Sequence, residues 1–258
     1  MTDLPAKDRG QLLACLLDMG AQLLDCGAEI SRVEDTLRRL GQAYGALHTD
    51  VFVIPSIISI STTFPDREVL TETCRIRSNG STDYHRLEQL NALSRVCCRE
   101  PWELDALKIR LEKIASGKRP VRPVYLGSAL GAGIFAIFFG GGIWDGLAAG
   151  AFALLICLMQ ERLGRTELNQ VATNLVISLL TGLGVGLVTL LIPALNMDMI
   201  LTGDIMLLIP GLAMTNAVRN LLVGDTISGV VRLAESLIWA VALAGGMMVA
   251  MMALQQLR

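Results

Sequence analysis

Residues 168–197 read LNQVATNLVISLLTGLGVGLVTLLIPALNM and contain no charged side chain. A helix needs about 20 consecutive apolar residues to cross the hydrocarbon core of a bilayer, so this stretch is long enough with residues to spare. Pro193 is expected to end the helix, because proline cannot donate the next backbone hydrogen bond. The stretch therefore predicts a transmembrane helix near residues 170–193.

Apolar stretches on both sides of this segment predict four more transmembrane helices. The first two, within 124–160, are separated by Gly140–Gly142 and are expected to form a helical hairpin. The fourth is interrupted by Asp204 and Pro210-Gly211, and the fifth has Glu235 near its start. We therefore expect residues 118–258 to form an all-α membrane domain of five transmembrane helices. These helices are expected near residues 124–141, 143–160, 170–193, 199–218 and 233–256.

Charge is distributed unevenly along the chain. Residues 1–123 hold 17 of the 22 lysines and arginines and 17 of the 24 aspartates and glutamates. Only 18% of all residues are charged, whereas soluble domains average about 25%. These values exclude a uniform soluble domain, a disordered chain and a nucleic-acid binder with a basic surface. The sequence predicts a charged domain in water followed by a domain in a lipid bilayer.

Lysine and arginine positions predict the orientation in the membrane. Cytoplasmic loops carry an excess of these residues. Among the lysines and arginines of residues 118–258, seven lie just before the first span, between the second and third spans, or between the fourth and fifth. Only Arg258 lies on the other side of the membrane. We expect a cytoplasmic N-terminal domain and a C-terminus outside. The seven residues are Lys118, Arg119, Arg122, Arg162, Arg165, Arg219 and Arg232.

Residues 1–117 are expected to form an α+β domain on the cytoplasmic side. Leucines at helical spacing in 11–26 and 33–44 predict two helices, the first ending at Gly27 and the second starting with a Ser31–Glu34 capping box. Short β-branched runs within 51–76 predict three strands of a small antiparallel sheet. Helical spacing then returns and predicts two more helices, near residues 87–93 and 104–114, with Pro101 at the start of the last.

The sequence offers little support for an enzyme. Asp83, His85 and the adjacent Cys97 and Cys98 include a nucleophile and a base, but their spacing matches no known catalytic arrangement. The six cysteines lack metal-ligand spacing and are expected to be reduced thiols. The acidic residues among the first thirty argue against a signal peptide. No catalytic residue, metal site or cofactor is expected.

Polar residues inside the apolar half are candidates for transport. A charged group in the hydrocarbon core costs about 2.5–3.5 kcal/mol on insertion scales, so it persists mostly where it faces a cavity or a partner. Asp204 either faces such a cavity or lies solvated at the outer interface. Glu235 is either a second transport carboxylate or an interfacial ion-pair partner of Arg232. Asn174 either belongs to a transport site or forms a hydrogen bond to a neighbouring helix.

The break at Pro210 and Gly211 is a further candidate. A helix broken there presents free amides at its new N-terminus, which favour an anion. Broken helices of this kind form midplane sites in transporters. Arg219, two turns further on, could grip a carboxylate with two hydrogen bonds.

The chain resembles the threonine/serine exporter (ThrE-type) family of bacteria. The resemblance rests on Pro210-Gly211, Asn216-Ala217, Arg219 to Leu222, Gly224-Asp225, Ser228-Gly229, Arg232 and Glu235. It extends to Gly141 to Gly146, which includes Asp145, and to Gly27 to Glu34 and Thr62 to Phe64 in the first domain. Asn220 departs from the pattern, which has an aspartate after the arginine. The chain is similar to the split, YjjP-like form, in which a separate small membrane subunit supplies the other half.

The resemblance implies a subunit of a secondary transporter in the bacterial inner membrane. It would export small carboxylate metabolites, threonine and serine or a dicarboxylate such as succinate, together with a companion small membrane subunit or as a homo-oligomer. The sequence contains no ATP-binding motif, so an ion gradient is the expected drive, with Asp204 and Glu235 as proton-linked carboxylates. The alternatives are a membrane-anchored enzyme and a regulatory scaffold in which the soluble domain is the active part. The candidate site residues are Asp145, Asn174, Asp204, Pro210, Gly211, Asn216, Arg219, Asp225, Arg232 and Glu235.

Overall fold

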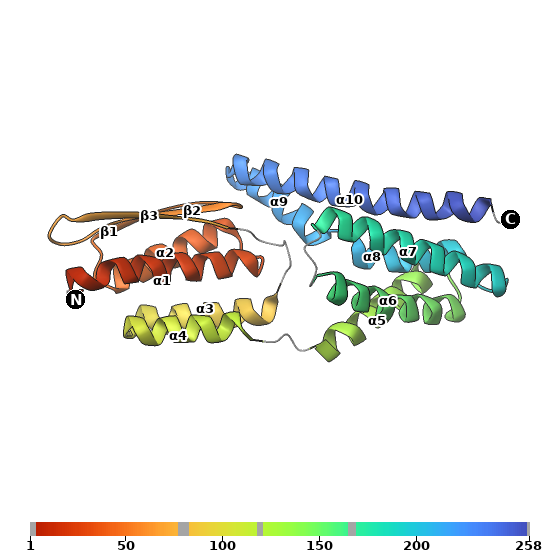
Figure 1. Cartoon of the computed structure of the whole chain (residues 1–258), viewed down its shortest axis with the longest axis horizontal. Coiled ribbons are helices and arrows are strands. Elements are labelled where there is room, and N and C mark those ends of the chain that lie inside the picture. Colours follow the sequence, from red (N-terminus) through yellow and green to blue (C-terminus); the bar gives the residue numbers. More distant parts are fainter. Residues whose placement is uncertain (1–3, 77–82, 118–120, 165–168, 257–258) are drawn as a thin grey trace. The chain divides into compact units, whose positions relative to one another are not determined.

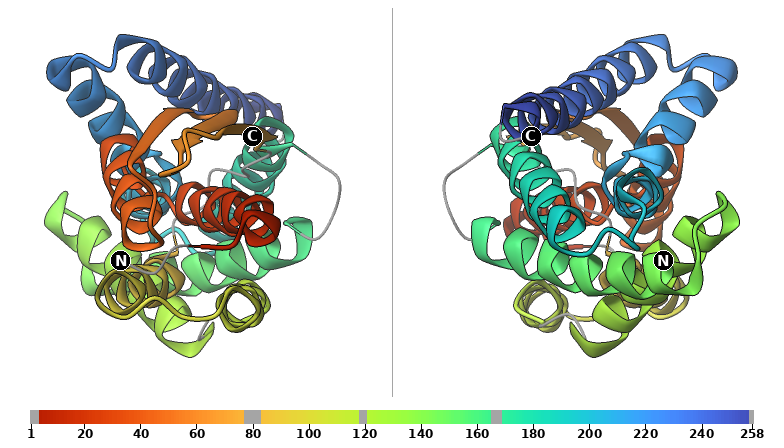
Figure 2. Two further views of the ribbon diagram at one scale, coloured as in Figure 1. Left: turned by 90° about the vertical axis from the view of Figure 1, so that its left-hand side faces the viewer. Right: turned by 90° about the vertical axis from the view of Figure 1, so that its right-hand side faces the viewer.

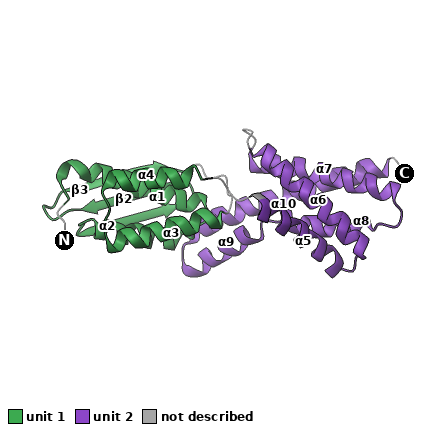
Figure 3. Ribbon diagram, turned by 90° about the horizontal axis from the view of Figure 1, so that it is seen from below, with its two compact units in different colours: residues 1–119 green, residues 120–258 purple. Residues whose placement is uncertain are grey.

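The chain forms two compact units, residues 1–119 and 120–258 (Figures 1 and 3). The structure, a computed structural model, describes residues 4–76, 83–117, 121–164 and 169–256. In these ranges the first unit contains helices and strands, whereas the second contains helices alone. The units are called the front unit and the rear unit below.

The front unit has two helices, three strands and two more helices, in the order that the sequence predicts. The sheet has the order β1-β2-β3, and both strand pairs are antiparallel. The elements are α1 (Ala6–Asp25), α2 (Ile30–Ala43), β1 (His48–Ile54), β2 (Ile57–Thr63), β3 (Val69–Arg75), α3 (Tyr84–Arg99) and α4 (Leu104–Ala115).

The front unit is built in three layers (Figure 1). Every second side chain of β1 and β2 is buried, as expected for strands with one covered face. Helices α1 and α2 cover that face, and α3 and α4 pack against their other side. Gly20 permits the close approach, because a Cβ there would lie 2.8 Å from side-chain atoms of both Leu37 and Ile58.

Two local predictions in the front unit are wrong. The expected Ser31–Glu34 capping box is absent, because α2 begins at Ile30 and Ser31 lies inside it. Glu34 instead accepts a hydrogen bond from the Val53 amide at 3.1 Å, which joins α2 to β1. Pro101 precedes α4 by three residues and is not its first residue. By contrast, the expected helix end at Gly27 is confirmed, since α1 stops at Asp25 and Gly27 has a φ of 84°.

Arg9 ties α1 to the turn between β2 and β3. Its Nη1 donates to Asp66 Oδ2 at 2.6 Å and also to Glu68, and its guanidinium lies 4.5 Å from the centre of the Phe64 ring. The hydrogen bond from Arg9 holds the pKa of Asp66 below its ordinary value. Asp66 therefore stabilises the fold above its unfolded pKa of about 3.9, and this stabilisation is lost as the pH falls through the lower folded pKa.

We expect Arg9→Gln to lower the melting temperature of the front unit at neutral pH. The variant should also lose less stability than the native chain on acidification below about pH 4, because Asp66 then lacks the partner that lowers its pKa. Thermal unfolding of the full chain in detergent at pH 7 and pH 3 measures both effects. Arg110→Gln, an exposed arginine on α4, is the control. Equal acid sensitivity of the Arg9 variant and the native chain would refute the assignment.

The rear unit consists of six helices in its described part. Gly140, with a φ of 109°, lies in the tight turn that joins the first two, as the sequence predicts. The last helix begins at Thr226, seven residues before the expected Leu233. The helices are α5 (Val121–Phe138), α6 (Ile143–Leu163), α7 (Gln170–Leu191), α8 (Met197–Leu208), α9 (Gly211–Val223) and α10 (Thr226–Gln255).

Glycine contacts give the relative directions of the helices. A Cβ at Gly133 of α5 would touch the Gly146 carbonyl of α6, and one at Gly150 would touch the Ala129 carbonyl, so α5 and α6 are antiparallel. Gly246 of α10 contacts Ser178 of α7, whereas Gly182 and Gly186, further along α7, contact the later residues Ala250 and Leu254. Helices α7 and α10 are therefore parallel and pack through small residues four apart, a common interface in membranes.

Three helices in the described ranges, α6, α7 and α10, are long and apolar enough to cross a membrane. Helices α8 and α9, bent by 49° at their junction, together qualify as a fourth, and the apolar part of α5 is shorter. Helix α10 lies beside α7 toward its C-terminal end and diverges from it toward its start, where α9 is its neighbour (Figure 2).

Candidate functional site

Asp204 is buried in the middle of α8. Its side chain is fully inaccessible, and neither carboxylate oxygen has a hydrogen-bond partner among the residues that the structure describes. The interpretation as a solvated residue at the outer interface is therefore wrong for this chain. Buried polar groups are nearly always hydrogen-bonded, and an exception suggests an absent water, ion or ligand.

Two apolar clusters fill the rear unit, one on each side of Asp204. Ile200, one turn before Asp204 on the same face of α8, belongs to the first, and Leu208, one turn after it, belongs to the second. Helices α6 and α7 both pack against α8 and contribute to both clusters, so Asp204 lies at the level between the two. The first cluster is Ala132, Ala136, Ala149, Ala153, Val185, Ile200, Leu201 and Met247, and the second is Ile156, Ile177, Leu208 and Leu243.

Thr181 occupies the matching level on α7. It lies four residues after Ile177, which belongs to the second cluster, and four before Val185, which belongs to the first. Its hydroxyl oxygen is buried and has no hydrogen-bond partner in the described ranges. Since α7 packs against α8, we infer that Asp204 and Thr181 lie at one level between the two clusters, which is called the polar layer below. Thr181 is not among the candidates predicted from the sequence, because threonines are common in transmembrane helices.

Gly203 fixes the position of this polar layer relative to α5. A Cβ at Gly203 would collide with the Ala132 carbonyl oxygen and lie 3.0 Å from the Ala136 side chain. The absence of a side chain lets α8 pack directly against the backbone of α5. One face of α8 is thus held on α5 while Asp204 faces the other helices.

The helix break expected at Pro210 and Gly211 is present. Helix α8 ends at Leu208 and α9 begins at Gly211, and between them the Gly211 amide bonds back to the Ile209 carbonyl at 2.8 Å. Pro210 has no amide hydrogen, so one carbonyl of α8 loses its usual donor. Asp204 lies six residues before Pro210, about 9 Å along the helix axis.

Helices α9 and α10 form a hairpin, and α10 has a row of polar residues along one face. Gly224, with a φ of 97°, makes the turn, and Gly229 packs directly on Leu221. Ser228, Arg232 and Ser236 follow one another at intervals of four along α10 and so share one face. Ser228 and Ser236 are buried, and neither the Ser228 hydroxyl nor Arg232 Nε has a hydrogen-bond partner in the described part of the chain.

The other candidates in this hairpin lie nearer its surface. Arg219 and Glu235 are exposed, whereas Asn216 and Asp225 are half-buried. Asp225 precedes the first residue of α10 but its side chain does not cap the helix. No ion pair within 4 Å joins Arg232 to Glu235, both of which lie in a described range, which disfavours the ion-pair alternative for Glu235.

Asp145 and Asn174 have defined hydrogen-bond partners. Asp145 is buried, and its two carboxylate oxygens accept hydrogen bonds from the backbone amides of Gly142 at 2.8 Å and Asn196 at 2.7 Å. It thereby joins the start of α6 to the loop before α8. Asn174 is also buried and accepts a hydrogen bond from Gln170 at 3.1 Å.

The front unit does not assemble the residues considered for catalysis. Asp83 caps α3 by accepting from the Arg86 amide, His85 bonds to Gln89 on the surface, and Cys97 is buried. Within the described ranges, no three histidine, cysteine or acidic side chains are grouped as a metal site would require.

Comparison with known proteins covers almost the whole chain. A family model described as "Putative threonine/serine exporter" matches residues 14–254. A protein of Klebsiella aerogenes named "Probable succinate transporter subunit YjjP" is 26% identical over 236 residues, which covers 89% of this chain and 88% of that protein. No solved structure matches the chain.

Proposed function

Because the chain belongs to the threonine/serine exporter family, we propose that it is one subunit of a secondary transporter that exports small carboxylate metabolites. The observation that carries this proposal is Asp204, a fully buried carboxyl group without a partner in the described residues. An ionised group in such surroundings is costly, and it persists where a substrate, an ion or a proton reaches it. We assign Asp204 the role of the proton-linked carboxylate.

The proposed substrates share a carboxylate group. The family is described as exporting threonine and serine, and the relative from Klebsiella aerogenes is named as a succinate transporter subunit. Amino acids and dicarboxylates alike would need a cationic group in the route. Arg232 fits this requirement, because its Nε is buried without a hydrogen-bond partner in the described ranges.

We propose that the rear unit crosses the membrane five times, with α8 and α9 together as one broken span. The parallel packing of α7 and α10 supports this count. Two parallel spans require the chain to cross the membrane once in the opposite direction after α7 and before α10. In the described ranges, α8 and α9 are the helices in that part of the sequence. Helix α5, with 18 residues, is about 27 Å long and so approaches the core thickness of about 30 Å.

The bias of lysine and arginine supports a cytoplasmic front unit and an external C-terminus in a bacterial inner membrane. In this orientation the α9–α10 hairpin is at the cytoplasmic side. Gly246 marks the part of α10 that contacts α7. Arg232 lies 14 residues before Gly246, a distance of roughly 21 Å along the helix axis. Arg232 then lies near the entrance and Asp204 deeper in the route.

A companion small membrane subunit is proposed to complete the route. Five helices are few to enclose a pathway, and the related protein is itself named a subunit. A homo-oligomer is the alternative arrangement.

The function is tested by efflux of labelled threonine, serine and succinate from cells lacking endogenous exporters. We expect efflux of at least one of these only when the chain is present, and its full rate only with the companion. Equal efflux from the companion expressed alone would make this chain a scaffold. Turnover of a substrate by the detergent-solubilised chain, without transport, would favour the enzyme alternative.

Burial supports Arg232 in place of Arg219 as the carboxylate clamp. We expect Arg232→Gln to lower the export rate at least about tenfold, because it removes a half-buried cation from the proposed route. Arg219→Gln, on the exposed face of the neighbouring helix, should lower it less. Efflux is measured at matched membrane levels of the two variants. A larger loss of export rate in Arg219→Gln than in Arg232→Gln would instead assign carboxylate binding to Arg219.

A further inference from the structure

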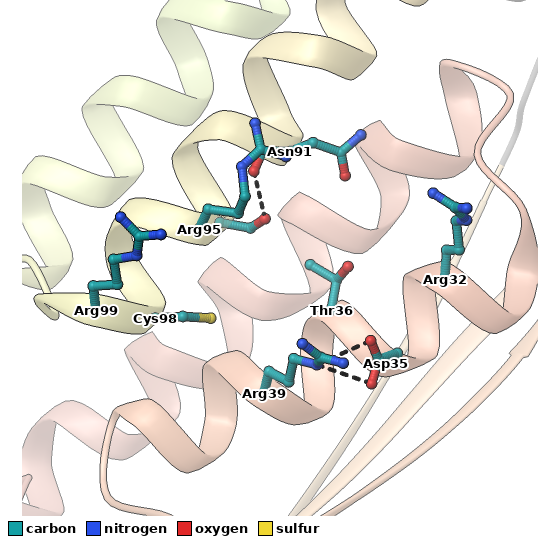
Figure 4. Close-up of a pocket in the computed structure, with 9 residues that line it drawn as sticks. Arg32, Asp35, Thr36, Arg39, Asn91, Arg95, Cys98 and Arg99 are labelled. Atoms are coloured by element: carbon teal, nitrogen blue, oxygen red, sulfur yellow. Dashed lines mark hydrogen bonds and ion pairs between the residues drawn. The ribbon is translucent and has the colours of Figure 1, made fainter.

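A groove of about 490 Å³ lies between α2 and α3 in the front unit (Figure 4). Residues of α2 form one wall and residues of the C-terminal half of α3 form the other. The lining side chains are Arg32, Asp35, Thr36, Arg39, Asn91, Ser94, Arg95, Cys98 and Arg99.

The groove has a strong excess of positive charge. Four guanidinium groups line it with a single carboxylate, that of Asp35, which pairs with Arg39 at 3.0 Å. Arg32 lies 3.6 Å from Glu29, whereas neither Arg95 nor Arg99 has a carboxylate within 4 Å among the described residues. Residues 1–123 as a whole hold equal numbers of cationic and anionic side chains, so the excess is local.

A second hollow of the front unit shows that this charge is specific to the groove. It has a similar volume, about 400 Å³, and is lined by Asp8, Glu103 and Asp105 with no lysine or arginine. The two hollows therefore have opposite charge, and anions are expected to enter only the groove between α2 and α3.

We propose that this groove binds a small molecule with two anionic oxygen groups, either carboxylates or phosphates. Planar guanidinium groups bind such groups through paired hydrogen bonds. Two arginines on each wall match a ligand with an anionic group at each end, and the Thr36 hydroxyl and Asn91 amide supply neutral contacts. The assignment concerns the front unit and holds whether or not the rear unit transports a substrate.

Occupation of the groove would join α2 to α3. Helix α2 is already bound to the sheet through Glu34 and the Val53 amide. A ligand that bridges the arginines of both helices would therefore hold the sheet and both helical layers together, and would raise the melting temperature of the front unit.

Binding is tested with the full chain in nanodiscs of zwitterionic lipid, using succinate, inorganic phosphate and pyrophosphate as probes. We expect saturable binding and a raised melting temperature with at least one probe, both weakened by added salt. The double variant Arg95→Gln/Arg99→Gln should raise the dissociation constant at least about tenfold. Both arginines are exposed, so the fold should tolerate the change. Arg110→Gln, exposed on α4, should bind like the native chain.

Cysteine labelling gives a second and independent readout. Cys98 lines the groove and Cys74 lies on β3, and both are partly accessible, whereas Cys15, Cys26 and Cys97 are buried. Burial raises the pKa of the Cys98 thiol, so its reaction with a maleimide is slow but measurable. A bound anion should protect Cys98 and leave the labelling of Cys74 unchanged.

The same labelling distinguishes the sources of the anion. Protection by soluble probes assigns the groove to a free metabolite. Protection only in nanodiscs that contain cardiolipin, whose headgroup carries two phosphates, assigns it to a lipid headgroup. The proposal is overturned if no condition protects Cys98 and no probe binds saturably, or if the double variant and Arg110→Gln bind equally.

Discussion

Replacing Asp204 with asparagine is expected to abolish net export while leaving the fold intact. The side chain keeps its size and polarity but can no longer take up and release a proton. Asp204→Leu should also abolish export, and should raise the free energy of unfolding by about 1–3 kcal/mol, because apolar packing replaces polar atoms that lack partners. Efflux assays and thermal unfolding in detergent measure the two effects.

Asp198→Asn is the matched control for this prediction. Asp198 lies in the first turn of the same helix and is exposed. Its substitution should change stability by no more than about 0.5 kcal/mol and leave export unchanged. A large loss of stability in both Asp204 variants would instead make this residue a structural element of the bundle.

Gly246→Ala is expected to disrupt the packing of α7 on α10, whereas Gly245→Ala is not. A Cβ at Gly246 would collide with the Ser178 hydroxyl and the Leu175 carbonyl oxygen, and the backbone oxygen cannot move aside without shifting α7. Overpacking of this kind costs about 1–3 kcal/mol, and more where backbone atoms are involved.

The neighbouring Gly245 has no atom within 4 Å of the position of a Cβ. Alanine there should raise stability by about 0.5–1 kcal/mol, because it favours the helix. Melting temperatures of the two variants in detergent, together with the amount inserted in membranes, test the interface. Similar melting temperatures for both variants would contradict the close packing of α7 on α10 at Gly246.

Most elements were predictable because their patterns are local. The uncharged stretch 168–197 predicts α7, since no other structure buries so many apolar residues in lipid. The start of α10 at Thr226 was not predictable from hydropathy, because Ser228 and Arg232 make its first turns polar. These turns are helical through their packing on α9. The expected Ser31–Glu34 capping box is absent for a similar reason, because the Glu34 carboxylate accepts a hydrogen bond from the Val53 amide instead.

The candidate site was predictable only in part. Asp204 is identifiable as a charged residue in an apolar stretch, but the sequence cannot tell a buried carboxylate from an interfacial one. Thr181 becomes a candidate only when its level between the two apolar clusters is known. The sequence favours Arg219 as the clamp, whereas the structure leaves Arg219 exposed and Arg232 half-buried.

We propose that the rear unit forms a route for substrate past Asp204. This route is tested most directly in liposomes that contain the purified chain and its companion and are loaded with labelled succinate or threonine. We predict that native protein both exchanges substrate at equilibrium and exports it in response to a pH gradient. We predict that Asp204→Asn retains exchange but no longer responds to the gradient. Gradient-driven export by the variant at the native rate would contradict the account.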